Sequence, residues 1–167
     1  MTTTTLSRNA AELYATNTVR ETNNGRCQIS GVMASGEYGA GNWCHRVAEG
    51  RGGPKVPANG LWLSAPAHRA THNAAALSRR AGWMVDTPPK STRWTLDEWS
   101  GYVRQVPALC LGQGVAGWFL LDASGDGMAE LVDPEDLDAA AARFGIDPTL
   151  TLPGALAELT RITGWRA

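Results

Sequence analysis

All three histidines of this chain fall within 28 consecutive positions, and this clustering constrains the fold more than any other feature. His68 and His72 are four residues apart, so on a helix both imidazoles would lie on one face. His45 directly follows Cys44 and stands shortly before a Gly-Gly turn. The arrangement predicts a compact metal site with an additional base next to it.

The segments that carry the cluster predict a hairpin followed by a helix. Residues 43–48 alternate as a strand, residues 61–63 form the returning strand, and two turns rich in Gly and Pro join them. A helix is expected from about Ala67 to Arg80, because Pro66 suits the first turn of a helix and Gly82 suits its end. The cluster would then lie in the crease between the hairpin and the helix.

The flanking segments predict the remainder of an α+β fold. A helix is expected over residues 6–24 with Ser7 as its N-cap, followed by a short extended piece at 26–32 and a loop at 36–41. After Gly82 we expect, in chain order, a short strand at 83–85, a turn or short helix at 94–103, strands at 106–111 and 117–121, a hairpin from there to 128–132, and helices at 133–144 and 153–162. This divides the chain into an N-terminal helix (1–25), a core (26–85) and a C-terminal extension packed on the core (86–167).

The net charge of −1 hides a division between two parts of the chain. Residues 20–93 carry ten Lys/Arg against four Asp/Glu, whereas residues 94–167 carry four Lys/Arg against eleven Asp/Glu. The basic part contains the histidine cluster. This asymmetry is compatible with a surface that faces phosphates beside an acidic appendage that could contact a protein partner.

Composition argues against a membrane or secreted protein. No apolar run approaches the roughly 18 to 20 residues that span a bilayer, and the first residues have no basic segment followed by an apolar core. The cysteines at 27, 44 and 110 are odd in number and irregularly spaced, which disfavours a disulfide framework and favours a reducing cytoplasm.

The stretch from Cys44 to His72 resembles the HNH (His-Asn-His) endonuclease motif, in the form common in actinobacteria and their phages. The resemblance rests on Cys44-His45, the Gly-Gly turn, Asn59, and the pair His68 and His72, and it covers residues 26–85. It implies a ββα-metal core with an N-terminal helix and a C-terminal hairpin and helical extension. It also implies an endonuclease or nickase that hydrolyses DNA, with His45 as general base and Asn59 bracing the hairpin that orients it. Cys44, His68 and His72 occupy the positions of the metal ligands.

Elementary chemistry agrees with these roles. A neutral imidazole suits general-base work near neutral pH, and three protein ligands leave an open position on a tetrahedral ion. One thiolate with two imidazoles favours zinc, with nickel or manganese as alternatives, whereas magnesium prefers oxygen ligands. Arg46, Arg51 and Lys55 on the same hairpin are candidate phosphate-binding residues.

The sequence departs from that family at its zinc knuckles, and simpler interpretations stay open. The two Cys-x-x-Cys positions read Cys27 to Ser30 and Ser64 to Ala67, so three of four thiolates are absent and a structural zinc is not expected. The alternative function is a catalytically degenerate HNH fold that binds DNA or protein, for example a phage-encoded regulator or inhibitor. Individually, the histidine pair could be surface residues, Cys44 a small buried hydrophobe, Asn59 a turn residue, and the three cations solvated side chains.

Overall fold

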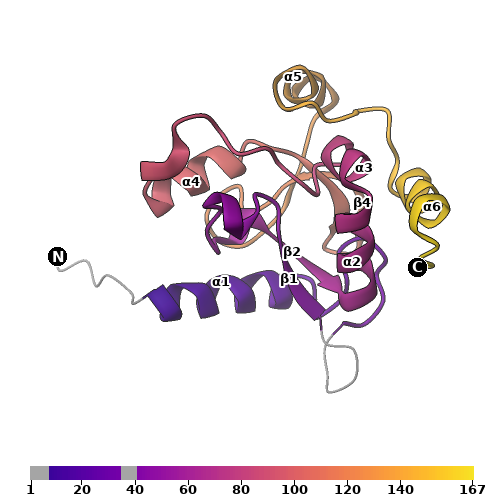
Figure 1. The fold of residues 1–167 in the computed structure, drawn as a ribbon, viewed down its shortest axis with the longest axis horizontal. Coiled ribbons are helices and arrows are strands. Elements are labelled where there is room, and N and C mark those ends of the chain that lie inside the picture. The colour runs from indigo at the N-terminus through magenta and orange to yellow at the C-terminus, as the bar shows by residue number, and fades with distance from the viewer. Residues whose placement is uncertain (1–7, 35–40) are drawn as a thin grey trace.

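The computed structural model describes residues 8–34 and 41–167, which form a mixed α+β fold (Figure 1). The predicted N-cap Ser7 and most of the predicted 36–41 loop lie outside this described part. The helices are α1 (Arg8–Thr22), α2 (Ala65–Asn73), α3 (Ala75–Arg80), α4 (Leu96–Val103), α5 (Pro134–Phe144) and α6 (Leu152–Thr163), with short 3-10 turns η1 (Glu49–Arg51), η2 (Pro57–Asn59) and η3 (Ser91–Arg93). The strands are β1 (Gly41–His45), β2 (Gly60–Ser64), β3 (Ala108–Gly112), β4 (Val115–Leu120) and β5 (Glu130–Leu131).

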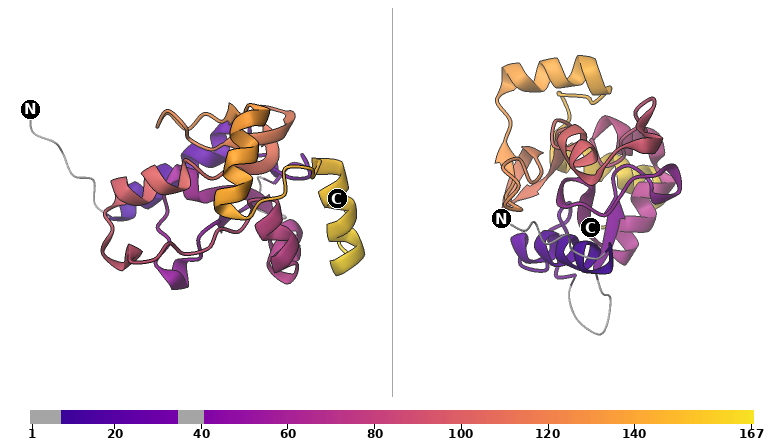
Figure 2. Two further views of the ribbon diagram at one scale, coloured as in Figure 1. Left: turned by 90° about the horizontal axis from the view of Figure 1, so that it is seen from above. Right: turned by 90° about the vertical axis from the view of Figure 1, so that its left-hand side faces the viewer.

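The predicted hairpin is present as β1 and β2, which pair antiparallel with Cys44 opposite Leu61 and His45 opposite Gly60. Gly60 is required there because a Cβ atom at this position would collide with the Trp43 ring. Both α1 and α2 contact the hairpin. Figures 1 and 2 show α1 and α5 at opposite sides of the molecule, with the hairpin, α2 and α3 between them.

The helix predicted over residues 67–80 is two helices. Ser64 caps the start of α2, its Oγ accepting a hydrogen bond from the Ala67 N–H at 3.4 Å. The chain then leaves helical geometry at Ala74 (φ −118°, ψ 52°) and resumes as α3. The buried Ser78 hydroxyl donates to the Thr71 carbonyl at 2.7 Å, which satisfies a carbonyl at the break.

Two short segments predicted as extended are not strands. Residues 26–32 form a tight turn in which the Gly31 N–H bonds the Cys27 carbonyl, and only a single bridge joins Arg26 to Met33. Residues 83–85 turn back on the end of α3, since the N–H groups of Trp83 and Met84 both bond the Ser78 carbonyl. In both cases local turn bonds replace the ladder that a strand would need.

The elements predicted in the C-terminal part are confirmed in type. Strands β3, β4 and β5 form an antiparallel sheet in that order, and the polar turn at residues 122–127 connects β4 to β5. Helix α4 starts with a capping box between Thr95 and Glu98. Helix α5 ends at Gly145, which adopts the left-handed conformation (φ 71°).

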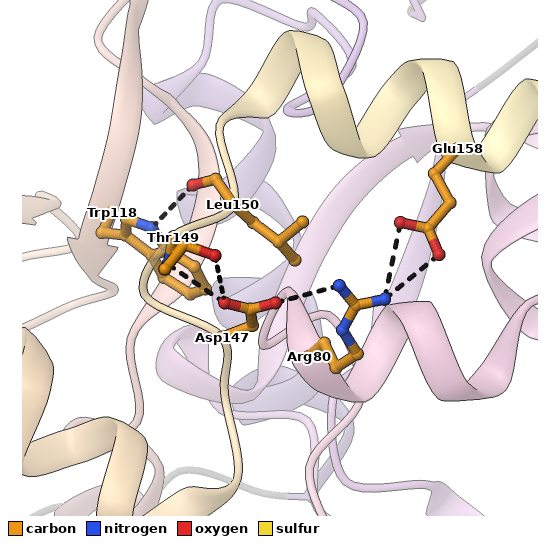
Figure 3. Close-up of polar contacts among 6 residues, drawn as sticks. All are labelled: Arg80, Trp118, Asp147, Thr149, Leu150 and Glu158. Atoms are coloured by element: carbon orange, nitrogen blue, oxygen red, sulfur yellow. Dashed lines mark hydrogen bonds and ion pairs between the residues drawn. The ribbon is translucent and has the colours of Figure 1, made fainter.

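A single large cluster of buried side chains joins all three predicted segments of the chain, from Val19 to Leu159. Arg80 reinforces it at the surface by pairing with Asp147 at 2.9 Å and Glu158 at 3.1 Å, which ties α3 to α6 and to the segment before it (Figure 3). The Trp118 indole donates to the Leu150 carbonyl of the same segment. Among the described residues, no helix is long and apolar enough to cross a membrane.

Candidate metal centre

The structure brings Cys44, His68 and His72 together. One ligand atom from each residue lies within 4.8 Å of the other two, and the Nε2 atoms of the two histidines are 3.0 Å apart. Cys44 is buried, His68 is half-buried and His72 is exposed, so the group runs from the core to the surface. Among the described residues, no other set of three His, Cys, Asp or Glu side chains converges in this way.

Local structure explains this convergence. Successive residues of a strand point to opposite faces, so Cys44 and His45 diverge from neighbouring positions of β1. Because the Ser64 cap starts α2 directly after β2, the first turn of the helix is held close to the hairpin. His68 then lies in this first turn and His72 one turn later, on the same face.

The donor set fits a tetrahedral transition ion. From zinc–ligand lengths of about 2.1 Å to nitrogen and 2.3 Å to sulfur, a tetrahedral site needs ligand atoms about 3.3 to 3.6 Å apart. The 3.0 Å between the two Nε2 atoms is close to this spacing, and all three ligand atoms lie within 4.8 Å of one another. Two nitrogens and one sulfur would leave a fourth position open.

Burial favours the uncharged forms of two members of the group, Cys44 and His68. Desolvation raises the pKa of the Cys44 thiol to about 12. The pKa of His68 is lowered, first by burial and then by repulsion from His72 and His45. A bound cation reverses the preference of Cys44, because it favours the thiolate, and it acts in the same direction as burial on His68, because it also needs the neutral imidazole.

His45 lies beside this group and is not part of it. The charged groups that act on its imidazole are Glu49, Lys55 and Glu12, and burial is the largest cause of its lowered pKa. Its Nε2 atom is buried and has no hydrogen-bond partner among the described residues. Its ring packs edge-on against Trp43 with the ring centroids 5.9 Å apart. The imidazole is therefore neutral at neutral pH, the form that can accept a proton.

Asn59 is fully buried and closes the loop that follows His45. Its Oδ1 accepts from the Val47 N–H at 2.7 Å, and its Nδ2 donates to the carbonyls of Val47 (3.1 Å) and Pro54 (2.9 Å). These bonds tie the two ends of the loop to each other. The side chain thus holds the loop closed at Val47 and Pro54.

The three predicted phosphate-binding residues have different environments. The prediction that Arg46 binds phosphate is wrong, because its guanidinium is buried and bonded to backbone carbonyls and is therefore not available to a phosphate. Arg51 is exposed on η1. Lys55 lines a cavity of about 480 Å³ together with Arg8, Glu12 and Glu49, between α1, the hairpin loop and the start of α4.

Comparisons of the chain with protein-family models, with curated proteins and with solved structures give no match. The site is therefore interpreted from its own chemistry.

Sequence reasoning missed the acidic residues near His45 and the surroundings of Arg46. Glu49 is four positions from His45, so a local charge effect could have been anticipated, but Glu12 reaches the site only through the packing of α1. Thr71 was also missed; its buried side chain hydrogen-bonds to the Cys44 thiol, and its position on the helix face of His68 and His72 was a usable signal.

Proposed function

We propose that this chain is a metal-dependent endonuclease or nickase of the HNH type, built on a ββα-metal core formed by β1, β2 and α2. The observation that carries the proposal is the convergence of Cys44, His68 and His72 on one point, with His45 next to it in the chain. If the two histidines were only surface residues at i and i+4, there would be no reason for a buried cysteine from another element to lie within 4.8 Å of them.

Cys44, His68 and His72 would hold one divalent ion, with zinc favoured and nickel or manganese as alternatives. When bound, such an ion stabilises negative charge on a phosphate ester. The buried thiol contributes a soft donor that disfavours magnesium.

His45 would take the proton from the attacking water, since its imidazole is neutral at neutral pH. Its Nε2 is buried, so this role requires the ring to turn toward the water. Asn59 would keep the loop after His45 closed through its three hydrogen bonds. Arg51 and Lys55 remain the candidates for contacts to the DNA backbone, which position a duplex without reading its sequence.

The test is cleavage of supercoiled plasmid with added Zn²⁺, Ni²⁺, Mn²⁺ or Mg²⁺. We expect the wild type to nick or cut with a transition ion, and His45→Ala to lose at least about a hundredfold in rate, the usual contribution of a general base. Asn42→Ala, an exposed change on the same strand, serves as the control and should cleave like the wild type. Equal rates for His45→Ala and Asn42→Ala would remove His45 as the base.

A second function is a catalytically degenerate HNH fold that binds DNA or protein. Two observations favour it: the Nε2 of His45 is closed off from solvent, and Arg46 is withdrawn from the surface. Between residues 126 and 138 the chain also carries six exposed acids and no Lys or Arg, which suits a basic protein partner. No cleavage with any of the four ions, together with retained binding to DNA or to a protein, would select this function.

A further inference from the structure

Arg46 is a buried cation bonded to five backbone carbonyls. It is 1% exposed, and its Nε donates to Gly82 at 2.8 Å. The Nη1 atom lies 3.3 Å from the Ala58 carbonyl and 3.5 Å from that of Val103, and Nη2 lies 2.7 Å from that of Val106 and 3.0 Å from that of Pro107. These contacts match the five N–H donors of a guanidinium. Within the described residues, no carboxylate pairs with it.

The sources of these carbonyls explain how the charge is tolerated without a carboxylate. Val103 is the last residue of α4, Gly82 follows the end of α3, and Ala58 lies in η2. Carbonyls at the C-terminal ends of helices carry partial negative charge. Burial lowers the pKa of Arg46 only to about 10, so the side chain is charged at neutral pH.

The main chain of Arg46 is fixed as firmly as its side chain. Its N–H donates to the Asn59 carbonyl at 2.9 Å, and its own carbonyl accepts from the Val85 N–H at 2.8 Å. The next residue, Val47, is bonded to the Asn59 side chain. The segment from His45 to Val47 is therefore clamped from two sides, by Asn59 and by the carbonyls around the guanidinium.

We infer that Arg46 is a positioning residue that fixes the position of His45 and of the loop closed by Asn59. It does so by anchoring the end of β1 to the segment that runs from Val103, the last residue of α4, to Pro107, just before β3. Residues of the C-terminal extension thereby become part of the framework of the hairpin. The link to catalysis rests on the proposed role of His45, whereas the anchoring itself can be measured without any cleavage.

The experiment compares Arg46→Met, which removes all five donors at similar volume, with Arg46→Lys, which keeps the charge and fewer donors. Leu159→Ala, in the buried face of α6, is the control that lowers global stability without touching this network. The main measurement is native-state amide hydrogen exchange at Val47, which is protected by the Asn59 side chain. Zinc affinity and, where cleavage occurs, kcat and KM are measured on the same proteins.

We expect exchange at Val47 to accelerate at least about tenfold more in Arg46→Met than the loss of global stability accounts for, because the loop opens locally. Arg46→Lys should be intermediate, and Leu159→Ala should show no excess at Val47. If cleavage is observed, kcat should fall by up to about a hundredfold, as for a displaced catalytic group, with KM and zinc affinity changed less than about threefold. Should Arg46→Met fail to fold, Arg46→Lys decides the question by the same measurement.

Exchange at Val47 that follows global stability in every variant would overturn the inference. So would a kcat that is equal in Arg46→Lys and Leu159→Ala when both are fully folded. Lack of cleavage by the wild type with all ions would instead count against the proposed endonuclease, while exchange at Val47 would still decide the anchoring.

Discussion

Replacing Asn59 by alanine removes a buried side chain that makes three hydrogen bonds; the Pro54 carbonyl keeps its bond from the Val56 N–H, whereas the N–H and carbonyl of Val47 lose the bonds that Asn59 makes to them. A hydrogen bond of this kind contributes about 1 kcal/mol net, and buried groups left unpaired cost more. We therefore expect Asn59→Ala to lower the free energy of unfolding by about 3 kcal/mol, within a range of roughly 2 to 5 kcal/mol.

This loss is large enough to measure by urea and heat. With a urea m-value of about 2 kcal/mol/M, the midpoint should fall by about 1.5 M. For a chain of this size each kcal/mol shifts Tm by about 2 to 4 °C, so Tm should fall by about 6 to 12 °C. Asn59→Asp should be at least as destabilising, since it keeps the acceptor for Val47, removes two donated bonds and buries a carboxylate.

Asn42→Ala provides the matched control, because Asn42 is exposed on the strand that leads into the same loop. Such a surface change should stay within about 0.5 kcal/mol of the wild type. If Asn59→Ala and Asn42→Ala unfolded at the same urea concentration, Asn59 would not brace the loop, and the role proposed for it beside His45 would lose its structural basis.

Two further predictions concern the metal group and the surface network. Zinc at a hundredfold excess over Kd should stabilise the wild type by about 2.7 kcal/mol, which scanning fluorimetry would detect as a rise in Tm. His72→Ala should abolish this rise and His45→Ala should keep it. The proposed ligand set is wrong if both variants respond alike. The Thr149 hydroxyl and Arg80 lower the pKa of Asp147 below its usual 3.8, so its contribution is present above that value and is lost as pH falls through the lower folded pKa. Asp147→Asn should remove this part of the acid dependence, worth at most about 1 kcal/mol because the pair is partly exposed. The difference in urea midpoint between wild type and Asp147→Asn should therefore shrink from pH 5 to pH 2, and an equal difference at both pH values would refute the prediction.

Local chemistry made much of the C-terminal part predictable. Thr95 followed three positions later by Glu98 is a capping box, and Gly145 after an alanine-rich run marks the end of a helix. The polar turn at 122–127 between two apolar runs indicates a hairpin. The spacing of His68 and His72 likewise indicated one helix face, because the geometry that matters there spans a single turn.

Features decided by distant partners were not predictable in this way. Arg46 looked like a surface cation on a hairpin, and its burial depends on carbonyls that come from residues 58 to 107. No Gly or Pro in the sequence indicates the helix break at Ala74. The hydrogen bond from the Ser78 hydroxyl to the Thr71 carbonyl, which satisfies a carbonyl at this break, follows from the tertiary fold. The apolar run at Trp83 suggested a strand, but the N–H groups of Trp83 and Met84 bond the Ser78 carbonyl of α3.

The positions that correspond to the zinc knuckles of the HNH proteins that the sequence resembles are held here by core packing and hydrogen bonds. Cys27 and Ala67 are fully buried in the same core, and Ser64 caps α2. The turn that begins at Cys27 is joined to β2 by Gln28, whose N–H donates to the Trp62 carbonyl at 2.8 Å and whose Oε1 accepts the Trp62 N–H at 2.7 Å. In the HNH proteins that the sequence resembles, a knuckle zinc would join the corresponding turn and strand. Here the two hydrogen bonds between Gln28 and Trp62 join them. We therefore expect metal analysis to find one ion per chain, lost in His72→Ala, and a second ion that survives this substitution would show that the turn at Cys27 has kept a metal site.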